Sequence, residues 1–292
     1  MQAGEILKVT GGRLLSGDPA AIIRADRITT DSRQVVRGSL FIALKGDKFD
    51  GNSFAGQALR KGAMGVVVSG PASLAHTAKD LVIKVDDTLK ALQAIAVRHR
   101  SKFDIPVVAI TGSNGKTTVK EMASAVLSSK YRVLKNEGTK NNHIGVPLTL
   151  LKLNEDHQMC VLELGMNHKG EIRTLGGMAR PRVAVITNIG PSHIEYFSGL
   201  DGIFRAKCEI FEPLERGGTA ILNGDDAYLS RVKRTGPRIV RFGVTDVCDF
   251  RASSIKASED GISFLLNGRS RFKLGVIGAH NVYNALAAIS VG

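Results

Sequence analysis

The sequence predicts an α/β protein, with a small α/β domain first and a parallel-sheet domain after it. From Pro106 onward, short apolar runs alternate with helical segments, and near-continuous Val, Ile and Leu runs are typical of parallel strands buried on both faces. A glycine-rich turn follows the first of these runs and precedes a helix. With 292 residues, 43% of them hydrophobic, the chain can form two domains, which we place at residues 1–85 and 86–292.

The first domain alternates short strands with helices. Apolar runs predict strands at residues 39–44, 65–68 and 81–85, and residues 53–61 predict a helix between the first two. Asp86 and Asp87 precede another helix with an apolar face, because a carboxylate at this position accepts hydrogen bonds from the first free backbone N–H groups. We therefore expect the domain boundary near residue 86.

The second domain contains apolar strands at residues 107–110, 159–162, 183–186 and 220–222. Residues 250–274 alternate in hydrophobicity around the turn dipeptide Asn267-Gly268, which predicts an antiparallel hairpin beside the parallel strands. Residues 280–289 predict a half-apolar helix close to the last residue, Gly292, so we expect a further element to follow it.

Composition narrows the class of protein. The net charge is +13, but Lys and Arg are spread along the chain, Trp is absent and aromatic residues are 5%. Nucleic-acid-binding proteins instead gather basic residues in patches with stacking aromatics, so the charge favours phosphorylated small molecules. No apolar run approaches the ~20 residues of a membrane span, the N-terminus lacks a signal peptide, and the three scattered cysteines suit a reducing compartment. We expect a cytoplasmic protein with no nucleic-acid partner and no membrane span.

The turn after residues 107–110 carries the clearest chemistry. It reads Thr111-Gly112-Ser113-Asn114-Gly115-Lys116-Thr117-Thr118 and leads into a helix. Glycines let backbone N–H groups surround phosphate, a helix N-terminus adds positive potential, Lys116 can reach the β- and γ-phosphates, and Thr117 can bind Mg²⁺. The pattern is shorter than the general phosphate-binding motif, and a glycine-rich turn with a surface lysine is the alternative. We favour an ATP site in a P-loop NTPase-like domain.

Polar residues follow several predicted strands of the second domain. Thr111, Glu163, Asn188 and Asn223 each lie at or just after a strand end. Ligands of open parallel sheets bind beyond the carboxyl ends of the strands, so we expect these residues along one edge. Glu163 is a candidate Mg²⁺ ligand, because Mg²⁺ prefers carboxylate oxygens together with substrate phosphates; a structural salt bridge is the alternative.

The glycine-rich turn resembles the ATP site of the Mur ligase family, and further motifs of that family follow in order. They are Thr30-Asp31-Ser32-Arg33, residues 38–46, Phe49-Asp50-Gly51, residues 141–151, residues 163–172 and residues 278–285. The resemblance covers nearly the whole chain and implies an ATP-dependent ligase that joins D-alanyl-D-alanine to UDP-N-acetylmuramoyl-tripeptide, a step of peptidoglycan precursor synthesis. It also implies a cytoplasmic monomer. Two departures stand out: the family's C-terminal domain is absent from this sequence, and Gly51-Asn52-Ser53 replaces Gly-His-Asp.

The resemblance also implies roles for individual residues. Lys116, Glu163, His193 and Lys207 would be catalytic; Thr117, Glu163, His193 and Lys207 would hold Mg²⁺, with a carbamate on Lys207. A lysine whose pKa is lowered by its site presents a neutral amine that CO₂ can capture. Asn281 and Asn284 share a helix face and would contact adenine. Ser32 and Arg33 would hold the uridine diphosphate end, and Asn142 and His168 would lie near the reacting groups. For each of these residues an ordinary structural or surface role is the alternative.

Three other functions stay open on the sequence. The first is a sister ligase that adds a different amino acid, or a related folate or cyanophycin-type ligase. The second is a chain that binds ATP and the UDP-linked precursor without efficient turnover. A nucleic-acid-binding NTPase is the most distant alternative.

Overall fold

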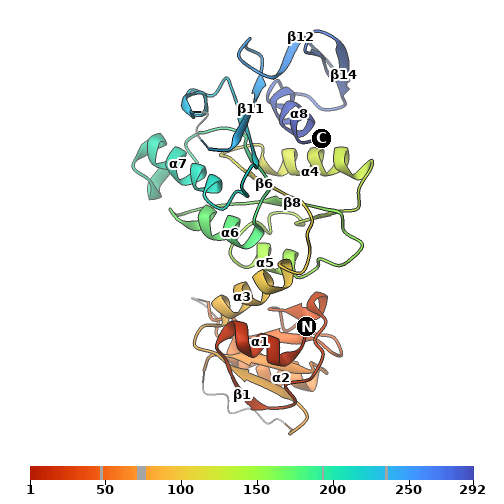
Figure 1. Ribbon diagram of the computed structural model, residues 1–292, viewed down its shortest axis with the longest axis vertical. Coiled ribbons are helices and arrows are strands. Elements are labelled where there is room, and N and C mark those ends of the chain that lie inside the picture. Colours follow the sequence, from red (N-terminus) through yellow and green to blue (C-terminus); the bar gives the residue numbers. More distant parts are fainter. Residues whose placement is uncertain (47–48, 71–76, 193, 234–235) are drawn as a thin grey trace. The chain divides into compact units, whose positions relative to one another are not determined.

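A computed structural model describes residues 1–46, 49–70, 77–192, 194–233 and 236–292. Its contacts divide the chain into two compact units, Met1–Asp104 with Pro147–Asn154 and Ile105–Val146 with Glu155–Gly292. Both are α/β in class, as predicted (Figure 1). None of the helices within the described ranges is both long and apolar enough to cross a bilayer.

The first unit is built on a mixed sheet with the strand order β1-β5-β4-β3-β2, in which β1 and β5 pair antiparallel and the β5–β4, β4–β3 and β3–β2 pairings are parallel. Buried aliphatic side chains of β3, β4 and β5 form much of its core. The elements of the unit, in chain order, are α1 (Ala3–Thr10), β1 (Arg13–Ser16), η1 (Ala25–Arg27), β2 (Ile28–Thr29), β3 (Leu40–Ile42), η2 (Gly51–Phe54), α2 (Ala55–Arg60), β4 (Gly65–Val68), β5 (Leu81–Lys84) and α3 (Thr88–Arg100).

Helix α3 belongs with the first unit, whereas the sequence pattern placed the boundary before it. Asp87 caps α3 as expected, accepting hydrogen bonds from the backbone N–H groups of Leu89 and Lys90. The helix packs against α1, and Glu5 of α1 forms ion pairs with Arg98 and Lys102 at 2.5 and 2.9 Å. An amphipathic helix does not itself reveal which neighbour covers its apolar face, so these contacts fix a division after Asp104.

The second unit is built on a sheet with the order β14-β13-β12-β11-β10-β9-β6-β8-β7. The pairings from β7 to the start of β12 are parallel, and β12, β13 and β14 continue the sheet as antiparallel strands. The elements are β6 (Val107–Thr111), α4 (Lys116–Ser128), β7 (Val133–Lys135), β8 (Met159–Glu163), α6 (Glu171–Ala179), β9 (Val183–Ile186), η3 (Ile194–Tyr196), α7 (Gly199–Cys208), η4 (Glu209–Phe211), β10 (Thr219–Asn223), η5 (Leu229–Arg231), β11 (Arg238–Gly243), β12 (Phe250–Ser258), β13 (Gly261–Leu266), β14 (Ser270–Leu274) and α8 (His280–Val291). Helix α5 (Gly145–Leu150) begins in this unit, and its residues from Pro147 onward belong to the first unit.

The sheet of the second unit is covered on both faces, as its apolar strands predict. Helices α4 and α8 pack side by side on one face, and α6 lies on the other (Figure 1). The predicted hairpin turn joins β13 to β14, where Asn267 and Gly268 adopt positive φ angles of 50° and 70°. Such angles are those of a tight hairpin turn, which is why Asn-Gly is favoured there.

Candidate active site

The glycine-rich turn joins β6 to α4 and folds as a close loop at the carboxyl edge of the sheet. Gly112 and Gly115 have φ angles of 147° and 79°. A Cβ atom on Gly112 would lie 1.9 Å from Thr187 Oγ1, and one on Gly115 would lie 2.4 Å from Asn284 Oδ1. Both glycines are therefore required by contacts as well as by backbone angles.

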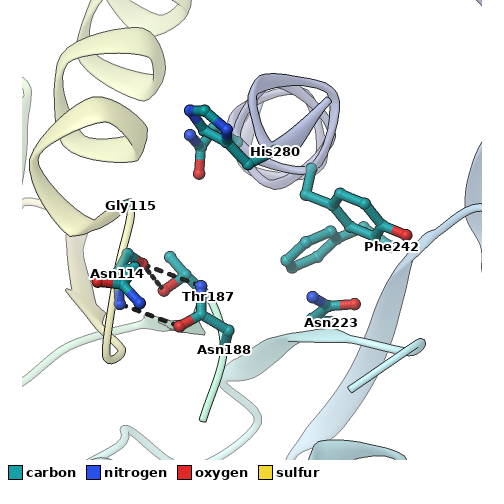
Figure 2. Close-up of a pocket in the computed structure, with 9 residues that line it drawn as sticks. Asn114, Gly115, Thr187, Asn188, Asn223, Phe242 and His280 are labelled. Atoms are coloured by element: carbon teal, nitrogen blue, oxygen red, sulfur yellow. Dashed lines mark hydrogen bonds between the residues drawn. The ribbon is translucent and has the colours of Figure 1, made fainter. Parts of the chain in front are cut away.

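The segment after β9 holds this loop in place. The hydroxyl of Thr187 donates to Asn114 O at 2.6 Å, and Asn188 Oδ1 accepts from Asn114 N at 2.9 Å (Figure 2). The Ser113 hydroxyl donates to Gly190 O at 2.9 Å. The sequence pattern marked Asn188 as a strand-end residue, whereas Thr187 was not anticipated. Nothing in the local pattern distinguishes that threonine, because its role depends on β9 lying next to β6.

The predicted alignment of strand ends is confirmed by the sheet order. Ile110 pairs with Glu163 across β6 and β8, and Thr111 pairs with Ile186 across β6 and β9. Asn223 ends β10, the next strand along. The polar residues that follow these strands consequently meet at one edge, which is where open α/β sheets bind their ligands.

Lys116 opens helix α4 and turns back over the loop. Its Nζ donates to Gly112 O at 2.9 Å and to Ser113 O at 3.0 Å. Burial lowers the pKa of Lys116, and the negative charge of Glu163 opposes that shift. The ammonium group thus lies at the mouth of the loop with two backbone carbonyls as its partners, which a phosphate can replace.

Glu163 is 1% exposed, and both of its carboxylate oxygens have partners. Thr117 Oγ1 donates to Oε2 at 2.8 Å, and Asn141 Nδ2 donates to Oε1 at 2.6 Å. The sequence motif contains Asn141 beside Asn142, and the family resemblance implies a site role for Asn142. In the structure Asn142 Oδ1 instead accepts from the N–H groups of Ile144 and Gly145 at the start of α5.

Lys207, on α7, is 2% exposed, although by composition alone it would pass for a surface lysine. Burial, followed by the nearby positive charge of Lys116, lowers the pKa of Lys207 to about 7. A large part of the Lys207 side chains is therefore neutral at pH 7. His193 lies outside the described residues.

A cavity of about 350 Å³ opens between the loop and α8. Its lining includes Asn114 and Gly115 from the loop, Asn223 and Phe242 from strand ends, and His280, Tyr283 and Asn284 from α8 (Figure 2). Aromatic rings beside amide groups suit a planar heterocycle, because the rings can stack and the amides can both donate and accept. Of the two asparagines predicted to contact adenine, Asn284 lines the cavity. Asn281 orients the Asn284 side chain, because Asn284 Nδ2 donates to Asn281 Oδ1 at 3.0 Å.

The remaining predicted residues lie elsewhere. His168 is exposed after β8 and makes an edge contact with the Tyr196 ring, with 4.7 Å between ring centroids. Ser32 and Arg33 follow β2 in the first unit. The Arg33 guanidinium, 87% exposed, pairs with Asp31 at 2.8 Å, and Lys61 Nζ donates to Ser32 O at 3.0 Å.

Comparison with known proteins gives the family. The Mur ligase middle domain matches residues 110–292, and the Mur ligase family catalytic domain matches residues 24–100. The chain belongs to the Mur ligase family. It is 41% identical over 270 residues to the UDP-N-acetylmuramoyl-tripeptide–D-alanyl-D-alanine ligase of Bacillus subtilis, covering 91% of this chain and 58% of that one. It is 39% identical over 293 residues to the Escherichia coli protein of the same name, covering 98% and 63%.

Solved structures of Mur ligases have the same fold as this chain. A crystal structure of MurF from Acinetobacter baumannii superposes with a TM-score of 0.89 at 35% identity, over 99% of this chain and 64% of that one. MurF from Thermotoga maritima, crystallised with ADP, gives 0.82 at 29% identity over 91% and 62%. The chain thus spans about three-fifths of the length of the relatives it matches.

Proposed function

We propose that this Mur ligase family protein is an ATP-dependent ligase that joins D-alanyl-D-alanine to UDP-N-acetylmuramoyl-tripeptide in peptidoglycan precursor synthesis. The observation that carries the proposal is the arrangement at the edge of the second sheet. There Asn114 and Gly115 of the glycine loop line the cavity beside α8, and Lys116 and the Thr117–Glu163 pair follow directly at the start of α4. Two relatives that are 41% and 39% identical to this chain have that name, and MurF from Thermotoga maritima was crystallised with ADP.

In this proposal the loop from Thr111 to Thr118 holds the phosphates of ATP. Lys116 exchanges the carbonyls of Gly112 and Ser113 for the β- and γ-phosphates, while the N–H groups at the start of α4 add positive potential. The adenine base occupies the cavity, where the Asn284 side chain hydrogen-bonds to the edge of the base. Asn281 keeps the Asn284 amide oriented. Phe242 and Tyr283 provide apolar contact.

The residues present fit Mg²⁺. A nearly buried carboxylate and a hydroxyl, Glu163 and Thr117, lie 2.8 Å apart beside the phosphate loop, and both are hard oxygen ligands. Within the described ranges no cluster of three or more His, Cys, Asp or Glu side chains could hold a metal by itself. Mg²⁺ commonly binds through one or two carboxylates and the substrate's phosphates, and there it neutralises charge on the transferred phosphoryl group. His193 and Lys207 are the further ligands that we propose.

Lys207 would contribute as a carbamate. With its pKa near 7, the neutral amine can attack the carbon of CO₂, and loss of one proton leaves an anionic carbamate. An anion at this position would offset the nearby charge of Lys116 and supply an oxygen ligand. A ¹³C NMR signal from protein incubated with ¹³C-bicarbonate, absent in Lys207→Met, would support the carbamate, and its absence from the unaltered protein would contradict it.

The reaction then requires positioning and charge neutralisation. A carboxylate oxygen of the tripeptide attacks the γ-phosphorus, the bond from that phosphorus to ADP breaks, and an acyl phosphate forms. The neutral amine of D-alanyl-D-alanine attacks the acyl carbon, and the tetrahedral intermediate expels phosphate, which accepts the proton that the nitrogen loses. Lys116 stabilises charge on the transferred group. Ser32 and Arg33 bind the uridine diphosphate end, and Asn142 and His168 lie near the reacting carboxylate.

The test is phosphate release that depends on ATP, UDP-N-acetylmuramoyl-tripeptide and D-alanyl-D-alanine together. Lys116→Ala should abolish it, and release at the unaltered rate in that variant would refute the assignment. Replacing D-alanyl-D-alanine with single amino acids tests the sister-ligase alternative. Calorimetry on the same samples separates binding without turnover from no binding. We further expect a cytoplasmic monomer that causes no salt-dependent shift of nucleic acid in a gel.

A further inference from the structure

We propose that Lys120 is a positioning residue, which fixes the carboxylate of Glu163 through the loop at residues 136–141. The inference rests on the proposed function, since that carboxylate is the proposed metal ligand. Lys120 lies on α4, three residues after Thr117, and its side chain is 0% exposed. A lysine is almost never buried to this degree unless its charge is paired, so its partners define its role.

The Lys120 ammonium holds a loop rather than a ligand. Its Nζ donates to Asn136 O at 2.9 Å and to Gly138 O at 3.1 Å, and Glu121 Oε1 lies 3.1 Å away. Three donors of one ammonium group thus meet three acceptors. Because two of these acceptors are backbone carbonyls, the lysine ties the segment after β7 to helix α4.

That segment holds the tip of β8 in turn. Asn136 is 0% exposed, and its Oδ1 accepts from Glu163 N at 2.9 Å. Its Nδ2 donates to Glu163 O at 3.1 Å and to Lys140 O at 3.0 Å. The Asn136 side chain therefore hydrogen-bonds to both backbone groups of Glu163 and to the end of its own loop.

The same loop also places Asn141 in contact with the Glu163 side chain. Asn141 Nδ2 donates to Oε1 at 2.6 Å, while Thr117 donates to Oε2 at 2.8 Å. Thr117 and Lys120 are spaced i, i+3 on α4 and so share a face of that helix. One helix face thus fixes both sides of the carboxylate, directly through Thr117 and by way of the loop through Lys120. A carboxylate has about four lone-pair positions, so lone pairs remain for a metal ion.

Neutralising Lys120 would remove this partner from the buried carbonyl of Asn136 and from the carbonyl of Gly138, and so release the loop. Loss of residues that orient a metal ligand typically costs about 10- to 100-fold in metal affinity or activity. In Lys120→Met we expect a loss of that size in the affinity for a non-hydrolysable ATP analogue with Mg²⁺. Affinity for the analogue in EDTA should change less than twofold, because the phosphate loop itself is intact. Lys120→Arg, which keeps the charge and the donors, should restore part of the loss.

The matched control is Lys135→Met. Lys135 pairs with the same Glu121 carboxylate, but its side chain is 40% exposed, so we expect unaltered affinity with and without Mg²⁺. Calorimetry of all variants is repeated in a Glu163→Gln background. If Lys120 acts through Glu163, Lys120→Met causes no further loss there.

Three outcomes would overturn the inference: an unchanged Mg²⁺-dependent affinity in Lys120→Met, an equal loss in EDTA, or an additive loss in the Glu163→Gln background. If Lys120→Met does not fold, as judged by its thermal transition, Lys120→Gln and the half-buried Asn141→Ala take its place. The inference fails unless both variants lose Mg²⁺-dependent affinity. The proposed function fails separately if the unaltered protein binds no nucleotide under either condition.

Discussion

The hydroxyl of Thr117 donates to the carboxylate of Glu163 at 2.8 Å, which joins the first turn of α4 to the end of β8. The two residues are 46 positions apart, and the parallel pairing of β6 with β8 brings them together. Lys116 lies next to Thr117 and interacts electrostatically with the same carboxylate. Burial lowers the pKa of Lys116, and the negative charge of Glu163 opposes that decrease. The phosphate loop and the proposed metal ligand therefore form one electrostatic unit.

Gly115→Ala tests the geometry of the loop. An L-residue in the left-handed region costs about 1–2 kcal/mol, and the added methyl would also lie 2.4 Å from Asn284 Oδ1. We expect the free energy of unfolding to fall by at least about 1 kcal/mol and nucleotide affinity to fall with it, measured by urea denaturation and calorimetry. Gly177→Ala is the control, since it lies within α6 where an added Cβ meets no described atom within 4 Å. That change should stabilise by roughly 0.5–1 kcal/mol. Equal effects of the two changes would contradict the account.

Lys207 predicts a pH dependence of stability. Its pKa is about 7 when folded, below that of an unfolded lysine, so the unfolded chain binds the extra proton between those two values. Burying the charged amine therefore lowers the free energy of unfolding by its full amount below pH 7. This destabilisation disappears as the pH rises towards ~10.4, so the protein becomes more stable across that range. In CO₂-free buffer, where Lys207 carries no carbamate, the difference in unfolding free energy between the protein and Lys207→Met should change by up to about 1.4 kcal/mol per pH unit in that window. A pH-independent difference would contradict the burial of a titrating amine.

Asn281 and Asn284 should act as one unit in nucleotide binding. Asn284 lines the cavity, and Asn281 accepts its N–H at 3.0 Å. Asn284→Ala should weaken ATP binding by about fivefold, the equivalent of one net hydrogen bond of about 1 kcal/mol. Asn281→Ala should weaken it through the same group, so the double variant loses no more than Asn284→Ala. Ser290→Ala on the same helix is the control. Additive losses would place Asn281 in direct contact with the nucleotide instead.

The features of the fold and the site that could be predicted from the sequence are those encoded by residues close together in the chain. The alternation of apolar runs and helices identified the parallel sheet, and the glycines at 112 and 115 identified the loop, because both signals lie within a few neighbouring residues. Lys120 and Lys207 could not be distinguished from surface lysines in this way. Their burial depends on segments far along the chain, such as the carbonyls at 136 and 138 that accept from Lys120. The contact of Asn141 with Glu163 could not be predicted for the same reason, since the adjacent residues Asn141 and Asn142 have different partners.

The most direct test is a crystal structure with Mg²⁺ and a non-hydrolysable ATP analogue. We expect the β- and γ-phosphates inside the loop of residues 111–118, with Lys116 Nζ moved from the carbonyls of Gly112 and Ser113 onto them. We also expect a metal ion bound by Thr117 and Glu163, and the base against Asn284. An analogue bound elsewhere, with Lys116 still on those two carbonyls at saturating ligand, would contradict this expectation.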